Sequence, residues 1–90
     1  MKQVEVMLTN DEGLHARPAS AFSKTSFKFK SKIKVFKNGS REKVYNPKSI
    51  LSILSMGAVK GDQLCIVAEG EDEELAVKEL KSLIENKFGE

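Results

Sequence analysis

The spacing of the apolar residues changes along this chain, and this change restricts the possible folds more than any other feature of the sequence. Val4, Val6 and Leu8 alternate with their neighbours, as in a strand that buries one face. The same two-residue period returns around Ile33 and Val35, whereas the segments between place their apolar residues near helical spacing. We therefore expect an α+β domain, and ninety residues leave room for only one, spanning residues 1–90.

Three helices are expected. The first begins near Pro18, because a proline loses nothing by lacking its N–H in a first turn. The second covers residues 50–56, with Ser49 as its N-cap and Gly57 as its C-cap. The third follows Gly70, starts among acidic residues and ends near Lys87, which suits the helix dipole at both ends. Its inward-facing residues are expected to be Ala76, Val77, Leu80, Leu83, Ile84 and Phe88.

Four strands are expected, at residues 3–8, 32–36, 41–45 and 63–68. Asn38-Gly39 predicts a tight hairpin between the second and the third, since both residues tolerate a positive φ. Asn46-Pro47 then ends the third strand. The element order is β-α-β-β-α-β-α, and four strands with all three helices on one face form a two-layer open-faced sandwich.

Composition excludes several classes of protein. No apolar run approaches the length of a membrane span, and the N-terminus has no signal-peptide core, so we expect a cytoplasmic protein that does not insert into membranes. Cys65 is the only cysteine, which excludes an internal disulfide, and we expect it to be a small packing residue. His15 is the only histidine, so we expect no metal site and no cofactor.

The charges divide the chain into two halves. Residues 17–48 carry ten lysines and arginines against Glu42 alone, whereas residues 69–90 carry eight acidic residues against three lysines. This asymmetry is typical of a protein that meets an acidic partner, either a nucleic acid or an acidic protein surface. Two solvated faces without a specific partner would give the same pattern.

The residues around His15 are those in which chemistry is most plausible. The histidine lies between a loop and the Pro18-marked start of a helix, where unpaired N–H groups bind anions such as phosphate. Arg17 adds a cation whose geometry matches phosphate oxygens. An imidazole with these neighbours has what a phosphoryl acceptor needs. The alternative is an ordinary surface or capping histidine; a metal site is less favoured, because only Asp11 and Glu12 lie nearby in the sequence.

Two segments resemble one known family. Residues 13–20, GLHARPAS, resemble the active-site motif of HPr, the histidine-containing phosphocarriers of the bacterial phosphotransferase system. Residues 48–57, KSILSILSMG, resemble the regulatory-serine segment of that family. The resemblance covers essentially the whole chain and implies a four-stranded antiparallel sheet with three helices on one face.

The resemblance also implies a function without catalytic turnover. His15 would accept a phosphoryl group on Nδ1 from phosphorylated enzyme I and pass it to the IIA domains of sugar permeases. Arg17 would steady the phosphohistidine, and Ala16 and Arg17 would offer backbone N–H groups. Ser49 matches the serine that an ATP-dependent HPr kinase/phosphorylase modifies in low-GC Gram-positive bacteria, where the modified protein is a corepressor for catabolite control protein.

The resemblance further implies a docking patch and a monomeric protein. The residues expected to meet partners are Ser20, Lys24, Phe27, Ile50, Leu51 and Leu54. The alternative is that Ile50, Leu51 and Leu54 are core residues, together with Ile53 and Met56. Met and Leu suit a surface that must fit several partners in turn.

The sequence departs from the family pattern in three places. Residues 40–47 are about three residues longer than expected, Pro47 precedes the serine helix, and Phe27 with the lysine run at residues 28–34 is uncommon. Two rival interpretations remain open. One is a regulatory HPr-like homologue acting through Ser49, although such a relative has glutamine where this chain has His15. The other is a basic nucleic-acid-binding module built on the lysine-rich second strand, although we expect no nucleic acid partner.

Overall fold

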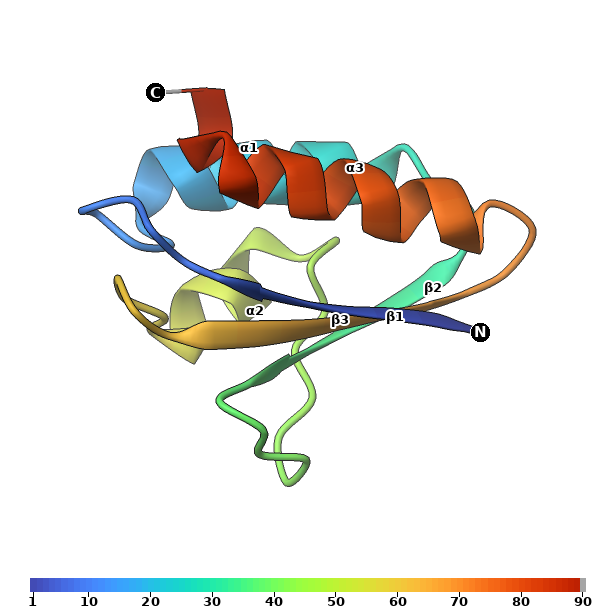
Figure 1. The fold of residues 1–90 in the computed structure, drawn as a ribbon, viewed down its shortest axis with the longest axis horizontal. Coiled ribbons are helices and arrows are strands. Elements are labelled where there is room, and N and C mark those ends of the chain that lie inside the picture. The colour runs from blue at the N-terminus through green and yellow to red at the C-terminus, as the bar shows by residue number, and fades with distance from the viewer. Residues whose placement is uncertain (90) are drawn as a thin grey trace.

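The expected alternation of strands and helices is present in the computed structural model, which describes residues 1–89. The elements are β1 (Lys2–Met7), α1 (Ala16–Phe27), β2 (Lys32–Lys37), α2 (Ile50–Met56), β3 (Gln63–Glu69), α3 (Glu73–Glu85) and the 3-10 turn η1 (Lys87–Gly89). The three strands form an antiparallel sheet in the order β1-β3-β2 (Figure 1). None of the helices described is both long and apolar enough to span a bilayer.

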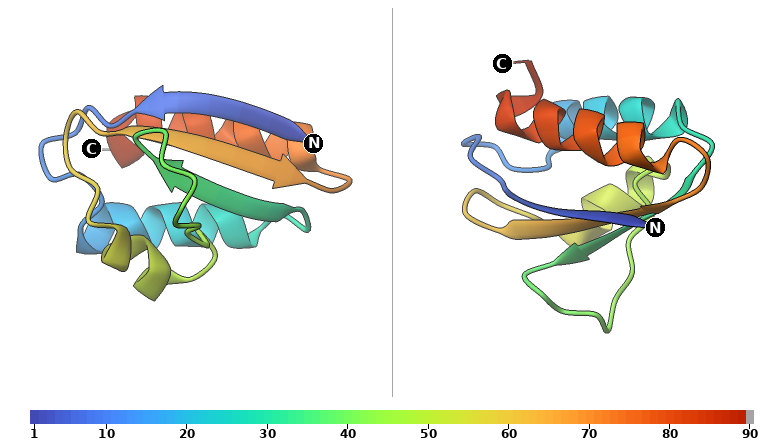
Figure 2. Two further views of the ribbon diagram at one scale, coloured as in Figure 1. Left: turned by 90° about the horizontal axis from the view of Figure 1, so that it is seen from below. Right: turned by 45° about the vertical axis from the view of Figure 1, so that its right-hand side comes forward.

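The core lies between one face of this sheet and the helices. Ile66 of the central strand pairs with Val4 on one side and with Val35 on the other, so apolar residues of all three strands share one face. Figure 1 shows α1 and α3 above that face, and Figure 2 shows α2 beside α1 near β2. The helices contribute Ala19 and Phe22 from α1, Ile53 and Met56 from α2, and Ala76, Leu80 and Ile84 from α3.

The prediction of a strand at residues 41–45 is wrong. Within the described residues this segment is joined to the sheet by a single bridge between Val35 and Tyr45. The predicted hairpin turn is nevertheless present, with positive φ at Asn38 and Gly39 and a hydrogen bond from the Ser40 N–H to the Lys37 carbonyl. A two-residue turn at this place would put Glu42 opposite Val35, but Tyr45 occupies that position, three residues later.

The physical reason lies in the side chains that follow the turn. Arg41, Glu42 and Lys43 are charged in succession and exposed, so this stretch has no apolar face that a strand could bury. Residues 40–44 therefore leave the ladder and cross below the sheet, on the side away from α1 and α3 (Figure 1). The sheet has three strands where we expected four, and the excess length at residues 40–47 is taken up by this excursion.

The excursion covers two apolar residues that are not part of the main core. Phe36 and Cys65 are paired neighbours on the outer face of the sheet, and both are buried. The Arg41 guanidinium stacks on the Phe36 ring at 4.3 Å from its centroid and donates to the Cys65 sulfur at 3.7 Å. Cys65 is thus a packing residue, as predicted, but its contacts are on the outer face.

The α2 helix confirms its predicted boundaries. The Ser49 side chain accepts a hydrogen bond from the Ser52 N–H at 3.3 Å, and Gly57 ends the helix with φ of 62°. The α3 helix, by contrast, ends earlier than predicted, at Glu85, so Lys87 does not lie in its last turn. Phe88 still reaches the core through η1, where its ring meets Phe22 edge to face at 6.4 Å.

Asp72 fastens the start of β2 to the start of α3, and we expect this contact to make stability depend on acid pH. Its carboxylate accepts hydrogen bonds from the Ser31 hydroxyl and from the N–H groups of Lys30 and Ser31. The Ser31 hydroxyl and the Lys30 N–H lower the pKa of Asp72 below its ordinary value of 3.8. A lowered pKa in the folded state stabilises the protein above pH 3.8, and that contribution is lost as pH falls further.

The test is urea unfolding at several pH values between 7 and 2. We expect Asp72→Asn to be less stable than the wild type at pH 7 and to approach it at the lowest pH, where the wild-type carboxyl is protonated. Equal differences between the two proteins at all pH values would contradict this account.

Candidate functional site

His15 is the residue that begins α1. It is the N-cap, with extended backbone angles, and its carbonyl accepts the first helical hydrogen bond, from the Ala19 N–H at 2.7 Å. Its side chain makes no capping hydrogen bond and is exposed. A side chain at an N-cap that does not cap is available for other chemistry, so the imidazole is free to meet a reactant from solvent.

The first turn of α1 supplies hydrogen-bond donors next to that imidazole. The N–H groups of Ala16 and Arg17 have no helical partner because they lie in the first turn, and within residues 1–89 neither donates to a carbonyl elsewhere. Pro18 follows them, lacks an N–H and is buried. Two N–H groups next to the histidine in the chain are therefore left without a backbone acceptor, as is usual in a first helical turn.

Arg17 is exposed and lines a cleft of about 660 Å³. The other walls of this cleft are the loop at residues 10–12 and the C-terminal turn at residues 87–89. No carboxylate forms a salt bridge with Arg17 in the part of the chain that the structure describes. Its guanidinium therefore keeps its donors unpaired among these residues, in a cleft that His15 does not line.

The loop that leads to His15 is held on both sides. The Asn10 amide nitrogen donates to the Gly13 carbonyl at 2.8 Å, and the Leu14 N–H donates to the Ala58 carbonyl at 3.0 Å. Lys60 forms an ion pair with Asp11 at 3.0 Å, and its hydrogen bond lowers the pKa of that carboxyl. These contacts hold the backbone immediately before the histidine.

Asn10 is the residue that the sequence interpretation missed. It belongs to the loop expected before His15, but it is buried, and its amide closes the loop at residues 10–13. Its side-chain oxygen is buried without a hydrogen-bond partner within residues 1–89. An asparagine at the start of a turn is common enough that no pattern in the sequence indicated this role.

Gly13 is the tightest point of this loop, and replacing it with alanine should destabilise the protein. A Cβ added there would lie 2.6 Å from the Ala58 carbonyl oxygen, and the φ of +64° is unfavourable for other residues. We expect a loss of about 2–4 kcal/mol in the free energy of unfolding. Gly39→Ala is the control, because Gly39 has a similar φ but open space around it, so it should lose only about 1–2 kcal/mol in the same urea titration. Equal losses would show that the close approach to Ala58 is unimportant.

Ser49 lies in a compact turn of its own. The Ser49 N–H donates to the Asn46 carbonyl at 3.0 Å, which puts Pro47 at the second position of a β-turn, where proline is favoured. Pro47 is buried in this turn. The Asn46 N–H donates to the Ser52 hydroxyl, and the Ser55 hydroxyl donates to the Ser52 carbonyl.

The helices α1 and α2, which begin at His15 and at Ser49, run antiparallel. Leu14 contacts Ala58 at one end, and the Ser23 hydroxyl donates to the Lys48 carbonyl at the other. Figure 2 shows α1 and α2 side by side. His15 and Ser49 therefore lie at opposite ends of one two-helix surface.

The predicted docking residues lie on these helices. Arg17, Ser20, Lys24 and Phe27 recur at helical spacing along one side of α1, and all but the half-buried Ser20 are exposed. On α2, Ile50, Leu51 and Leu54 are exposed, whereas Ile53 and Met56 are buried. The alternative in which all five are core residues is wrong. The two helices together present apolar and basic side chains between His15 and Ser49.

The chain is similar to known proteins over most of its length. A family model described as the PTS HPr component phosphorylation site matches residues 2–86. The phosphocarrier protein HPr of Mycoplasma pneumoniae is 39% identical over 85 residues, which cover 94% of each chain. An HPr crystal structure from Thermoanaerobacter tengcongensis is 48% identical, with a TM-score of 0.92 over 100% of this chain and 98% of that one. An HPr from Bacillus anthracis is 34% identical, with a TM-score of 0.84 over 92% and 95%.

These matches, together with the fold, define a phosphocarrier of the phosphotransferase system, which is a carrier and not a catalyst. The chain belongs to the HPr family.

Proposed function

We propose that His15 accepts a phosphoryl group from phosphorylated enzyme I and passes it to the IIA domains of sugar permeases in the cytoplasm, with the protein acting as a monomer. The observation that carries the proposal is the exposed N-cap imidazole, which makes no capping hydrogen bond. The carrier role of the family supports the same assignment.

The proposed transfer uses few groups. Nδ1 of His15 attacks phosphorus as the bond between phosphorus and its donor atom on enzyme I breaks. The N–H groups of Ala16 and Arg17 and the Arg17 guanidinium hold the phosphoryl oxygens, and these donors are already in place before transfer. In the second step a nucleophile on the IIA domain attacks the same phosphorus, and His15 leaves as a free imidazole.

Incubation with phosphoenolpyruvate and enzyme I tests this proposal. We expect one acid-labile phosphate per chain by intact mass, lost on brief acid treatment, and transferred on when a IIA domain is added. An acid-stable phosphate, or none, would overturn the assignment of His15.

We further propose that Ser49 is a regulatory site for an HPr kinase/phosphorylase and that its phosphorylated form engages catabolite control protein. Ser49 is half-buried at the start of α2, and among residues 1–89 its hydroxyl oxygen is held only by the Ser52 N–H at 3.3 Å, near the limit for a hydrogen bond. Ser52 and Ser55 are poorer candidates, because both lie within the helix and both hydroxyls are engaged in backbone hydrogen bonds. The buried Pro47 shapes the turn that a kinase would have to bind.

Ser49→Asp mimics part of this modification, and we expect it to slow phosphorylation of His15 by about tenfold. Aspartate is as good an N-cap as serine, so the melting temperature should change little. The added negative charge lies on the docking side of α1 and α2 and repels partners with acidic surfaces. Ser49→Asn is the matched uncharged control and should react at the wild-type rate. Equal slowing in both variants would point to the shape of the turn and would contradict the electrostatic account.

A further inference from the structure

One peptide group in the loop before His15 is held from two sides. The Gly13 carbonyl accepts a hydrogen bond from the Asn10 side-chain amide at 2.8 Å, and the Leu14 N–H of the same peptide donates to the Ala58 carbonyl at 3.0 Å. Because a peptide group is planar, these two contacts set its orientation. The Gly13 N–H also donates to the Asn10 carbonyl at 3.2 Å. Asn10 therefore holds Gly13 through both its backbone and its side chain.

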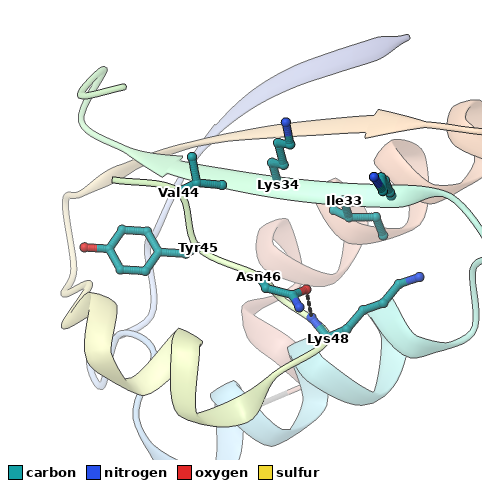
Figure 3. Close-up of a pocket in the computed structure, with 7 residues that line it drawn as sticks. Ile33, Lys34, Val44, Tyr45, Asn46 and Lys48 are labelled. Atoms are coloured by element: carbon teal, nitrogen blue, oxygen red, sulfur yellow. Dashed lines mark hydrogen bonds between the residues drawn. The ribbon is translucent and has the colours of Figure 1, made fainter. Parts of the chain in front are cut away.

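Asn10 does not act as an asparagine usually acts in a turn. The usual contact is a side-chain oxygen that accepts from the N–H two residues later, and Asn46 makes it, to the Lys48 N–H at 3.0 Å (Figure 3). Asn10 instead donates through its amide nitrogen, and its oxygen is buried without a hydrogen-bond partner within residues 1–89. An ionised aspartate accepts as an asparagine oxygen does, but it has no N–H to donate to the Gly13 carbonyl. The contact at position 10 therefore requires the donor of the amide.

Stability alone does not explain this side chain. Asn10 is only 2% exposed, and a buried oxygen without a partner destabilises the folded state. A leucine has nearly the same shape, and it would leave the Gly13 carbonyl unpaired but would remove the unpaired Asn10 oxygen. The exchange replaces one unpaired oxygen by another, so we expect it to change stability little. A buried polar group that brings no gain in stability is typical of a functional site.

Asn10 lies close to the residues that we assign to phosphoryl transfer. It lines the same cleft of about 660 Å³ as Arg17. Between the held peptide and His15, the Leu14 side chain is buried in the core. On the other side of His15, its carbonyl accepts from the Ala19 N–H within the first turn of α1. The backbone is therefore held both before and after the histidine, and the side chain that does so before it is Asn10.

We infer that Asn10 is a positioning residue for phosphoryl transfer to His15, an inference that rests on the function proposed above. Its amide orients the held peptide, and with it the direction in which the chain enters α1. That direction places the Cα–Cβ bond of His15 relative to the N–H groups of Ala16 and Arg17. Because an attacking atom and its donors must meet the phosphoryl group within a fraction of an ångström, a small change in this direction slows transfer. Asn10 itself is buried and contacts neither the phosphoryl group nor the partner.

The test is steady-state phosphorylation by enzyme I and phosphoenolpyruvate, with the full chain as the varied substrate. We expect Asn10→Leu to lower kcat about tenfold and to leave KM within about twofold of the wild type, because the docking surface on α1 and α2 is unchanged. Its melting temperature should stay within about 3 °C of the wild type, since one unpaired oxygen replaces another. Asn10→Ala should divide its effect between kcat and KM in the same way.

Asp72→Asn is the control for a general loss of stability. Asp72 follows β3, whereas the loop at residues 10–13 follows β1, and the two strands are antiparallel, so these segments lie at opposite ends of the sheet. We expect this variant to be destabilised at pH 7 but to keep the wild-type kcat and KM. A loss of kcat confined to the Asn10 variants therefore reports on the loop before His15.

Four results would overturn the inference and leave the carrier step intact. One is a wild-type kcat in both Asn10 variants. Another is a raised KM with an unchanged kcat, which would place Asn10 in the partner interface. The third is an equal loss of kcat in Asp72→Asn, which would assign the effect to stability. The fourth is failure of both Asn10 variants to fold, which would make the residue purely structural. Absence of labelling in the wild type would instead refute the proposed function, and this inference with it.

Discussion

His15→Ala should abolish phosphorylation by enzyme I while leaving the protein folded. His15 is the only histidine, so no second imidazole is present to take its place. Its side chain is exposed and makes no capping hydrogen bond, so its removal costs little packing or capping energy. We expect labelling to fall by at least about a thousandfold, to background, because the acceptor atom itself is lost.

The companion variant is His15→Gln, which retains a polar side chain of similar reach but no nucleophilic nitrogen. It should be as inactive as His15→Ala, and both should unfold within a few tenths of a kcal/mol of the wild type in urea. Residual labelling of either variant at the wild-type rate would place the phosphoryl group on another residue. A large loss of stability would instead show that the imidazole supports the start of α1.

Leu51→Glu should weaken transfer to IIA domains by about ten- to a hundredfold. Leu51 is 76% exposed on α2, between His15 and Ser49, in the surface that we assign to partners. The substitution removes an apolar contact at the centre of that surface and adds a charge that acidic partners repel. Steady-state transfer from the phosphorylated protein measures the effect.

Leu75→Glu provides the matched control for this prediction. Leu75 is 53% exposed, but it lies on α3, outside the α1–α2 surface. Both variants should keep the wild-type melting temperature, because neither leucine is buried in the core. Equal transfer rates for Leu51→Glu and the wild type would show that Leu51 is not part of the partner interface. Equal impairment by Leu75→Glu would show that the slower transfer comes from the net charge of the protein and not from the place of the substitution.

The caps and faces of the helices could be predicted from the sequence because they depend on neighbouring residues. Ser49 and Gly57 bound α2 as expected, and the helical period separates the exposed Leu51 from the buried Ile53. The position of His15 at the start of α1 follows from the same local rules. The exposure of the His15 side chain does not follow from these rules, since the side chain of an N-cap histidine is equally able to turn inward.

The errors concern contacts between distant parts of the chain. Asn38-Gly39 specifies a turn, but it does not decide how far the next residues stay paired with β2, and the pairing returns only at Tyr45, opposite Val35. The role of Asn10 depends on a loop that packs on residues 58–60, far along the chain. In the third helix, positive φ values at Lys87 and Phe88 break the helical run that the apolar spacing suggested.

Because residues 40–44 cover the outer face of the sheet, the rate at which a thiol reagent labels Cys65 measures how often this segment opens. Cys65 is the single thiol and is buried beneath Arg41. A thiol reagent can reach it only when the segment lifts from the sheet or the whole chain unfolds. The dependence of the labelling rate on urea separates these two events, because a local opening exposes little surface and is nearly insensitive to denaturant. Without any engineered label, the chain therefore reports how often its longest irregular connection opens.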